Sequence, residues 1–246
     1  MKKWFGYGVS FLGLYLFFVI STIPAQFLLG FVNVPKEISL TDVSGTLWNT
    51  KVEQVEYKDV ILTKVEANVD FWSLFTLDPS IDLSFGSALT AGPEGKLTIS
   101  GLLSALTVHN ADILVSANTI VQRFPLPIEV VARNEVRIIA DEFVLGKPIC
   151  EVANGKIQWQ KASMQAMNQT VILGDLTALF TCKKGALELA IDPKNDLGVS
   201  LVVTVRDNGI KGLGNLLPGA KFPKPLKAAL PFLGQPDSKG RYRLSF

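Results

Sequence analysis

The sequence predicts a mainly β protein, in which an N-terminal single transmembrane helix precedes a curved antiparallel sheet with a short Pro/Gly-rich helical segment. Three observations support this fold class. Residues 4–35 carry no charged side chain. After them, apolar and polar residues alternate with a period of two in several segments, as in half-buried strands. Short breaks rich in Gly, Pro, Asn and Asp separate those segments and favour antiparallel hairpins.

The N-terminal helix is predicted from the length of the apolar run. A helix rises about 1.5 Å per residue, so residues 4–23 are long enough for the roughly 30 Å of a bilayer's hydrocarbon core. Aromatic residues are spread around this helix, which argues against a buried helix with one polar face. A cleaved signal peptide is the alternative, since Ile23-Pro24-Ala25 offers a cleavage point, but the run is longer than a signal core.

The flanking charges predict the orientation of this helix. Lys2 and Lys3 precede the run, and positive flanks stay on the cytoplasmic side of a membrane. The prediction is therefore a membrane anchor over residues 1–35 in a bacterial inner membrane, with a cytoplasmic N-terminus. Residues 36–246 are predicted to form one periplasmic β-rich domain, which is long enough to bury a core of its own.

Charge and cysteine content narrow the possible partners. Lys+Arg 24 against Asp+Glu 22 gives a net charge of +2, so no nucleic-acid partner is expected. Cys150 and Cys182 are the only cysteines and lie in the part assigned to an oxidising compartment. We expect a disulfide, which would stabilise the fold by about 3 to 4 kcal/mol through its loop. Two unpaired buried thiols are the alternative.

The strands are predicted from alternation and from turn residues. In residues 61–71 the odd positions from Ile61 to Phe71 are apolar or small and are expected to face the core. Similar alternation occurs in residues 81–85, 199–206 and 241–246. Asn154-Gly155 is the sharpest turn signal, because both central residues of a type I′ turn need positive φ, and it predicts a hairpin between residues 150–153 and 156–160. The expected antiparallel sheet has on the order of ten strands.

Residues 207–239 do not follow the strand pattern. Gly and Pro interrupt the segment repeatedly, yet many of its other residues are apolar. Short helical turns packed over an edge or opening of the sheet would fit both facts. Four lysines punctuate the segment, and contact with a membrane surface is the alternative to simple solvation: Lys211, Lys221, Lys224 and Lys227.

The sequence predicts neither catalysis nor a cofactor. His109 is the only histidine, so a two-histidine metal site is excluded and any catalytic triad would have to use this residue. Its strand-like setting favours a solvated or hydrogen-bonded side chain. No phosphate-binding loop and no cluster of metal ligands is present in the sequence pattern. We therefore expect no enzymatic activity, no metal and no cofactor.

One short motif gives a family resemblance. Gly45, Thr46, Leu47 and Trp48 stand shortly after the predicted anchor, with Ile23-Pro24-Ala25 at its end and Gly240-x-Tyr242-x-Leu244 near the C-terminus. Together these features resemble the type II secretion system protein N family over nearly the whole chain. Within the motif, Gly45 permits a bend, and Trp48 supplies a large ring for the core or for a membrane surface.

The resemblance implies an accessory inner-membrane component of the Gram-negative apparatus that exports folded proteins across the outer membrane. Its partners would be other type II secretion system components and inner-membrane lipid, and it carries no catalytic residues over. The strand-rich body is also similar to AsmA-like proteins, which implies an alternative function as a periplasmic lipid-binding or lipid-transfer module. Tyr242, Leu244 and Phe246 match the last strand of an outer-membrane barrel, but the anchor and the mixed polarity of the strands oppose that reading.

Overall fold

The structure is a computed structural model that describes residues 2–30, 35, 37–58, 60–73, 78–87, 92–102, 104–123, 129–166 and 169–246. Residues 31, 32 and 91, part of the predicted apolar run and of one predicted turn, lie outside this description. The chain clusters into two compact units, Met1–Glu94 and Gly95–Phe246. The predicted division at residue 36 stays a prediction. The mainly β, antiparallel character of the fold is confirmed in both units.

The first unit pairs four antiparallel strands in sequence order beside two helices. Its elements are α1 (Lys2–Thr22), α2 (Ala25–Leu29), β1 (Ile38–Gly45), β2 (Asn49–Tyr57), β3 (Val60–Val69) and β4 (Ile81–Phe85). Val43, Val52 and Val65 come from three adjacent strands and form the buried core with Ala25 of α2. The three valine side chains point to the same face of the sheet, so they stack across neighbouring strands.

The predicted transmembrane helix is wrong. α1 ends at Thr22, and Pro24, which has no N–H to continue a helix, separates it from the five-residue helix α2. α1 covers almost the whole of the predicted span over residues 4–23, and α2 is a separate, shorter helix. Within the described part of the chain, no helix combines the length and the apolar character that crossing a membrane requires.

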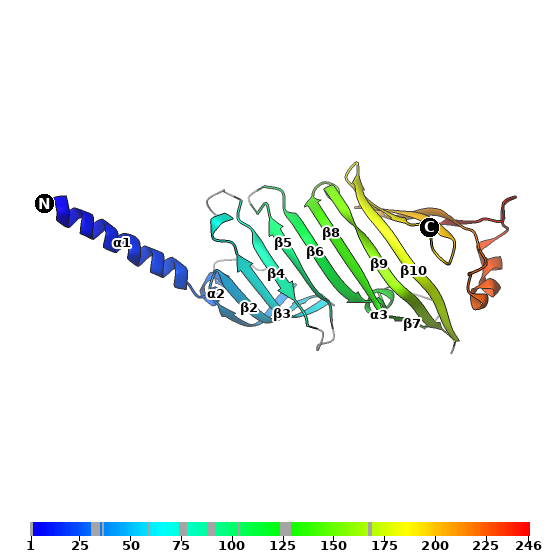
Figure 1. Cartoon of the computed structure of the whole chain (residues 1–246), viewed down its shortest axis with the longest axis horizontal. Helices are drawn as coiled ribbons and strands as arrows, with labels where there is room; N and C mark the ends of the chain where they lie inside the picture. The colour runs from blue at the N-terminus through cyan, green and yellow to red at the C-terminus, as the bar shows by residue number, and fades with distance from the viewer. Residues whose placement is uncertain are drawn as a thin grey trace. The chain divides into compact units, whose positions relative to one another are not determined.

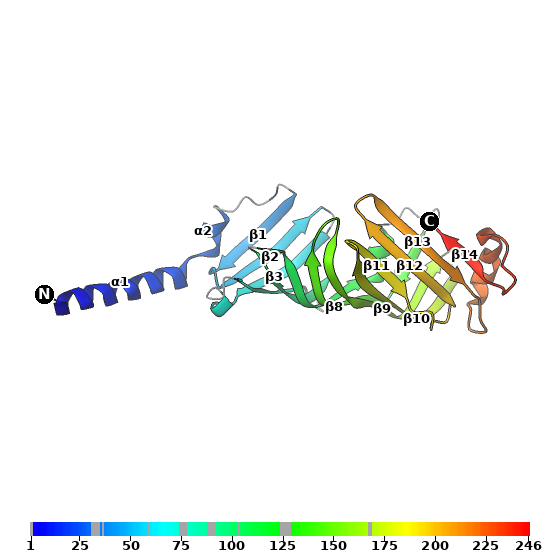
Figure 2. The same cartoon turned by 90° about the horizontal axis from the view of Figure 1, so that it is seen from above.

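The second unit contains the remaining strands and two short helices. The strands pair antiparallel in the order β5-β6-β8-β9-β10-β11-β12-β13-β14, and β7 pairs with β9. Figure 1 shows β6, β8, β9 and β10 running side by side, and Figure 2 shows the same for β11, β12 and β13. The bounds are β5 (Glu94–Ser100), β6 (Thr107–Ser116), α3 (Ala117–Val121), β7 (Val130–Arg133), β8 (Glu135–Leu145), β9 (Cys150–Ala166), β10 (Gln169–Lys183), β11 (Ala186–Ile191), β12 (Val199–Arg206), β13 (Gly209–Leu216), the 3₁₀ helix η2 (Lys224–Leu233) and β14 (Tyr242–Ser245).

The main core of the second unit combines one large ring with small side chains. Phe180 of β10 is buried against Ala111, Ala140 and Ala153, which come from β6, β8 and β9. The small alanine side chains leave room for the Phe180 ring. Such a fit is needed because protein interiors are packed at nearly crystalline density. Partly buried aliphatic side chains surround this group from β5 to β11.

The predicted strands are confirmed over residues 60–69, 81–85, 199–206 and 242–245, but one predicted face is not. Lys64 adopts a positive φ of 51°, and the order of side chains changes there. Leu62 packs against the core, whereas Ile61 is 46% exposed, the reverse of the prediction. Val65 is buried as predicted. The irregular backbone at Lys64 therefore reverses which side chains face the core in the part of β3 that precedes it.

The predicted turn at Asn154-Gly155 is wrong. Both residues lie inside β9, which runs unbroken from Cys150 to Ala166. Gly155 pairs with Ala140 on one side and with Phe180 on the other. A Cβ at Gly155 would collide with the Phe180 ring and the Ile139 carbonyl, so this glycine serves close packing in a strand and not chain reversal.

The prediction for residues 207–239 is confirmed in one part and wrong in the other. The helical element is present as η2. Residues 209–216, however, form β13, which pairs with β12 along its whole length despite three glycines. A side chain at Gly214 would meet the Ser200 carbonyl, and one at Gly212 would meet the Phe246 ring. These glycines again allow close approach within a sheet.

Replacing Gly155 with Ala should destabilise the second unit by about 1 to 3 kcal/mol, because the new methyl group overpacks a filled core. Urea unfolding of the purified chain measures the change. Gly219→Ala is the matched control, since nothing lies within 4 Å of the position its Cβ would take. Equal unfolding midpoints for the two variants would show that Gly155 is not constrained by the Phe180 ring.

Candidate functional site

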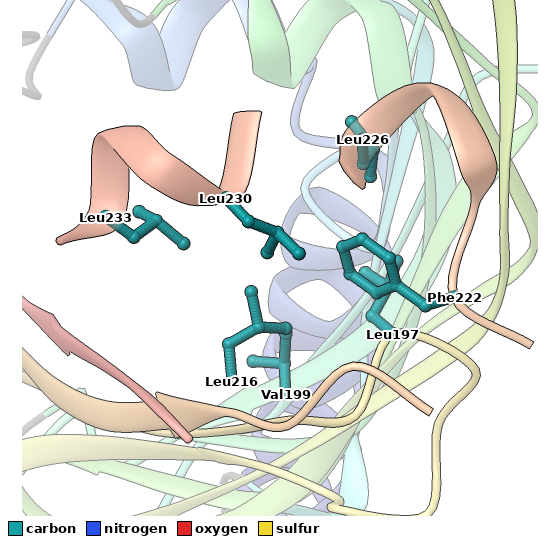
Figure 3. Close-up of a pocket in the computed structure, with 7 residues that line it drawn as sticks. All are labelled: Leu197, Val199, Leu216, Phe222, Leu226, Leu230 and Leu233. Carbon is teal, nitrogen blue, oxygen red and sulfur yellow. The ribbon is translucent and has the colours of Figure 1, made fainter. Parts of the chain in front are cut away.

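A pocket with an apolar lining lies beneath η2 at the C-terminal end of the second unit. Its volume is about 210 Å³. Figure 3 shows the side chains of η2 on one side and those of Leu216 and Val199 on the other, with the Phe222 ring pointing between them. No charged or polar side chain is part of the lining, which consists of Leu197, Val199, Leu216, Phe222, Leu226, Leu230 and Leu233.

Local sequence explains why η2 covers this pocket. Pro223 precedes the helix, Pro225 stands in its first turn, and Gly234 ends it with a positive φ of 94°. Leu230 and Leu233 are three residues apart, so they lie above one another on a 3₁₀ helix, and Leu226 from its first turn lines the same pocket. The prediction for residues 207–239 includes apolar residues among the turns but no pocket.

Strand pairing supplies the floor of the pocket. Val199 of β12 and Leu216 of β13 are register partners, and Leu216 is only 6% exposed. Phe222 follows in a turn, where its N–H donates to the Gly219 carbonyl at 3.1 Å, and it is also buried. Residues from three separate parts of the chain therefore meet at one apolar space, a relation that the sequence pattern could not reveal.

The edge of the pocket is basic and apolar. Lys224 and Lys227 are exposed on η2, and Lys221 forms an ion pair with Asp196 at 3.2 Å. The sequence contains no acidic residue from Lys221 to Gln235. Phe232 of η2 is 89% exposed, and Leu233, which lines the pocket, is 42% exposed. This edge can contact an apolar group, an anionic group or a molecule that carries both.

The predicted family motif forms the tight turn between β1 and β2, and it holds the end of α1. Gly45 has a φ of 88°, and the Thr46 N–H donates to the Asn49 carbonyl at 3.0 Å. Thr46 also forms a bridge with Pro24, and the Leu47 N–H donates to the Ile23 carbonyl at 3.0 Å.

Trp48 completes this junction. Its indole Nε1 donates to the Ile20 carbonyl at 3.1 Å, which satisfies an acceptor in the last turn of α1. Its ring packs edge-on against Phe71 with 5.1 Å between the ring centroids. The motif is thus a structural joint between a helix and a sheet. The sequence predicted a position in the core or at a membrane surface for the Trp48 ring, and it did not predict the contact with Phe71.

The two cysteines are adjacent at the ends of β9 and β10. Their sulfur atoms are bonded at 2.16 Å and their Cα atoms lie 6.0 Å apart. Cys150 is 1% exposed and belongs to the core around Phe180. Such burial suits a structural crosslink and leaves no accessible thiol for redox chemistry.

The polar groups of the second unit form structural pairs. The Nε2 atom of His109 on β6 lies 3.1 Å from the hydroxyl of Ser100, the last residue of β5. Arg137 donates two hydrogen bonds to Asp112, at 2.8 and 2.6 Å, and this hydrogen bonding lowers the pKa of the Asp112 carboxyl. In the described residues, no three His, Cys, Asp or Glu side chains gather as metal ligands.

A second lowered pKa belongs to a turn near the C-terminus. The Asp237 carboxyl accepts the backbone N–H of Arg241 at 2.9 Å and the guanidinium of the same residue, and these hydrogen bonds lower the pKa of Asp237. The lowered pKa keeps the carboxylate ionised as the acceptor that fixes the turn before β14. The Asp237 side chain fixes the backbone of this turn, as in other Asx turns.

Comparison with known proteins identifies the family. The family described as "Type II secretion system (T2SS), protein N" matches residues 36–245. A protein named "Type II secretion system protein N" from Vibrio cholerae serotype O1 is 27% identical over 247 residues, covering 98% of this chain and 97% of the relative. A protein of the same name from Aeromonas hydrophila is 28% identical, covering 96% of this chain and 94% of the relative.

A further relative with this name, from Pectobacterium carotovorum subsp. carotovorum, is 23% identical and covers 97% of this chain and 94% of its own length. No solved structure gives a significant match. The family match covers most of the chain and includes the turn that holds the end of α1. The resemblance inferred from the motif is therefore confirmed, and the chain belongs to the type II secretion system protein N family.

Proposed function

We propose that this protein is an accessory component of the type II secretion system at the inner membrane, with residues 36–246 in the periplasm. It takes part in protein export through contacts with other components of the system, and it catalyses no reaction. The observation that carries the proposal is the apolar pocket edge with its exposed Phe232, in a chain whose family is defined by secretion. Contact surfaces of this kind mark protein–protein interaction sites.

Exposed side chains of α1 support the membrane location. Ten large apolar side chains between residues 7 and 20 are 41% to 74% exposed, and they form one continuous apolar surface: Tyr7, Phe11, Leu12, Leu14, Tyr15, Leu16, Phe17, Phe18, Val19 and Ile20. Soluble monomers rarely leave a patch of this size in water. Contact with lipid removes it from water and keeps the attached sheet near the membrane.

The cysteine pair supports the periplasmic location. Disulfides persist in oxidising compartments, whereas thiols in the cytoplasm stay reduced. The bond between Cys150 and Cys182 crosslinks two neighbouring strands of the second unit. We propose that it forms in the exported part of the protein and stabilises that unit.

The first prediction from this function concerns Phe232. Phe232→Asp should reduce secretion while leaving the level and stability of the protein unchanged, because the side chain is exposed and its contacts within the chain are few. Secretion of a reporter substrate and immunoblotting of the variant measure the two quantities. Ile172→Asp is the matched control, since Ile172 is another largely exposed apolar residue, at 72%, and lies on β10, outside the pocket.

Further variants separate contact from catalysis. His109→Ala should leave secretion intact, because the proposed function uses no acid–base group. A photoreactive amino acid at position 232 should crosslink to another secretion component when the system is assembled. Normal secretion by Phe232→Asp, together with no crosslink at position 232, would contradict the proposed contact surface.

A second candidate function is lipid binding, and the wholly apolar lining of the pocket favours it. Lys221, Lys224 and Lys227 beside the pocket would attract the headgroup of an anionic lipid while the apolar side chains receive part of an acyl chain. In this function the protein binds or transfers lipid in the periplasm, and its contribution to secretion is indirect.

The two candidates predict different results for a variant that fills the pocket. Leu230→Trp replaces the leucine side chain with a larger indole ring in the space beneath η2. If lipid binding is the function, lipid that co-purifies with the wild-type chain should fall severalfold in this variant, as measured by mass spectrometry of extracted lipid. Leu213→Trp is the control on an exposed strand position. Equal lipid content in all three proteins, with secretion components still captured, would exclude this second function.

The proposed disulfide can be tested in protein taken from cells. Peptides containing Cys150 and Cys182 should appear joined in mass spectrometry without reductant and separate after reduction. The double variant Cys150→Ala/Cys182→Ala should unfold with a free energy lower by about 3 to 4 kcal/mol, the value expected for a loop of this length. Two thiols that react freely with an alkylating reagent before reduction would contradict the bond.

A further inference from the structure

Three aromatic rings form a cluster at the C-terminal end of α1. The aromatic cluster consists of Trp48, Phe71 and Trp72, with 5.1 Å between the first pair of ring centroids and 5.7 Å between the second. Both pairs meet edge to face, the arrangement that aromatic rings favour. The outermost ring is largely accessible, since Trp72 is 74% exposed and Phe71 is 37% exposed.

The local backbone holds this exposed ring in place. Asp70 Oδ1 accepts the Trp72 N–H at 3.0 Å, and the Asp70 carbonyl accepts the Ser73 hydroxyl at 2.6 Å. Ser73, which is 9% exposed, in turn accepts the Ser80 N–H at 2.9 Å. A turn tied by three hydrogen bonds thus presents a tryptophan to the outside, and the hydrogen bonds satisfy the polar groups of the turn.

The aromatic cluster is continuous with the apolar surface of α1. Trp48 donates its indole N–H to the Ile20 carbonyl, and Ile20 is the last of the exposed apolar residues along that helix. Scattered exposed apolar residues need no explanation, but a fixed aromatic cluster joined to an apolar helix forms one extended surface. Its occupant must therefore cover both parts.

We infer that Trp48, Phe71 and Trp72 form a contact site for a lipid surface, at the level of the headgroups beside α1. Tryptophan suits this region because its ring is apolar while its N–H is polar, and aromatic residues are enriched where membrane meets water. No cluster of Lys or Arg accompanies the three rings on the turns that carry them, so the contact depends on the interface and not on a specific anionic headgroup. The inference rests on the proposed membrane location.

Tryptophan fluorescence of the full chain tests this inference. Trp4, Trp48 and Trp159 are replaced by Phe, which leaves Trp72 as the reporter and keeps a ring at each position. A second reporter retains Trp48 as well, so that the bond to Ile20 is preserved. Each protein is placed in vesicles of phosphatidylethanolamine and phosphatidylglycerol, with or without lipid brominated on its acyl chains. Emission from Trp72 should shift to shorter wavelength on binding, and brominated lipid should quench it.

The matched control carries its indole at the other end of the same sheet. Trp72→Phe and Tyr57→Trp are combined in the background with no other tryptophan. Tyr57 is 46% exposed and ends β2, eight residues after its start, a span of about 26 Å along the strand. This reporter should keep its emission in brominated vesicles and should stay accessible to acrylamide. Thermal unfolding checks that every variant folds like its parent.

The outcomes distinguish the proposed membrane location from the proposed contact at the aromatic cluster. If the chain does not float with vesicles in a density gradient, the proposed membrane location fails, and the inference fails with it. If the chain floats but neither Trp72 reporter is quenched by brominated lipid, the inference alone is overturned. Equal quenching of the Trp72 and Tyr57→Trp reporters would also overturn it, because contact would then not be specific to the aromatic cluster.

Discussion

The contact between the Phe180 ring and Gly155 governs the arrangement of the second unit. The ring lies where a side chain at Gly155 would have to be, so glycine lets β9 and β10 pair in register without displacing the ring. Ala140 and Ala153 extend the same small-residue floor to β8 and β9. β9 and β10 depend on this fit, and so do the strands that pair on either side of them.

Period-two alternation predicted the existence of the strands but not the faces they present. Along β3 the pattern of apolar residues suggested that Ile61 and Val65 lie on one face, yet only Val65 is buried. The change occurs at Lys64, which takes a positive φ. Lysine has no preference for that conformation, so nothing in the sequence marks the position. Sheet pairing imposes it, and Lys161 in β9 is a second example.

Local turn signals were reliable only where no packing demand opposed them. Lys184-Gly185 forms a two-residue hairpin with positive φ at both positions, as its composition suggests. Asn154-Gly155 is a stronger turn sequence, but it lies inside a strand because a glycine at position 155 leaves room for the Phe180 ring. The pocket illustrates a different limit. The apolar residues of η2 are visible in the sequence, whereas Val199 and Leu216 join them only through strand pairing.

The family motif shows why a signature can be informative without chemistry. The motif from Gly45 to Trp48 contains no His, Cys, Asp or Glu, yet the turn makes three separate contacts with residues 20–24. Each contact uses backbone or a single N–H, so the turn and the helix end fix one another in position. Because these contacts join the end of α1 to the sheet, a surface that binds the helix also determines where the sheet lies.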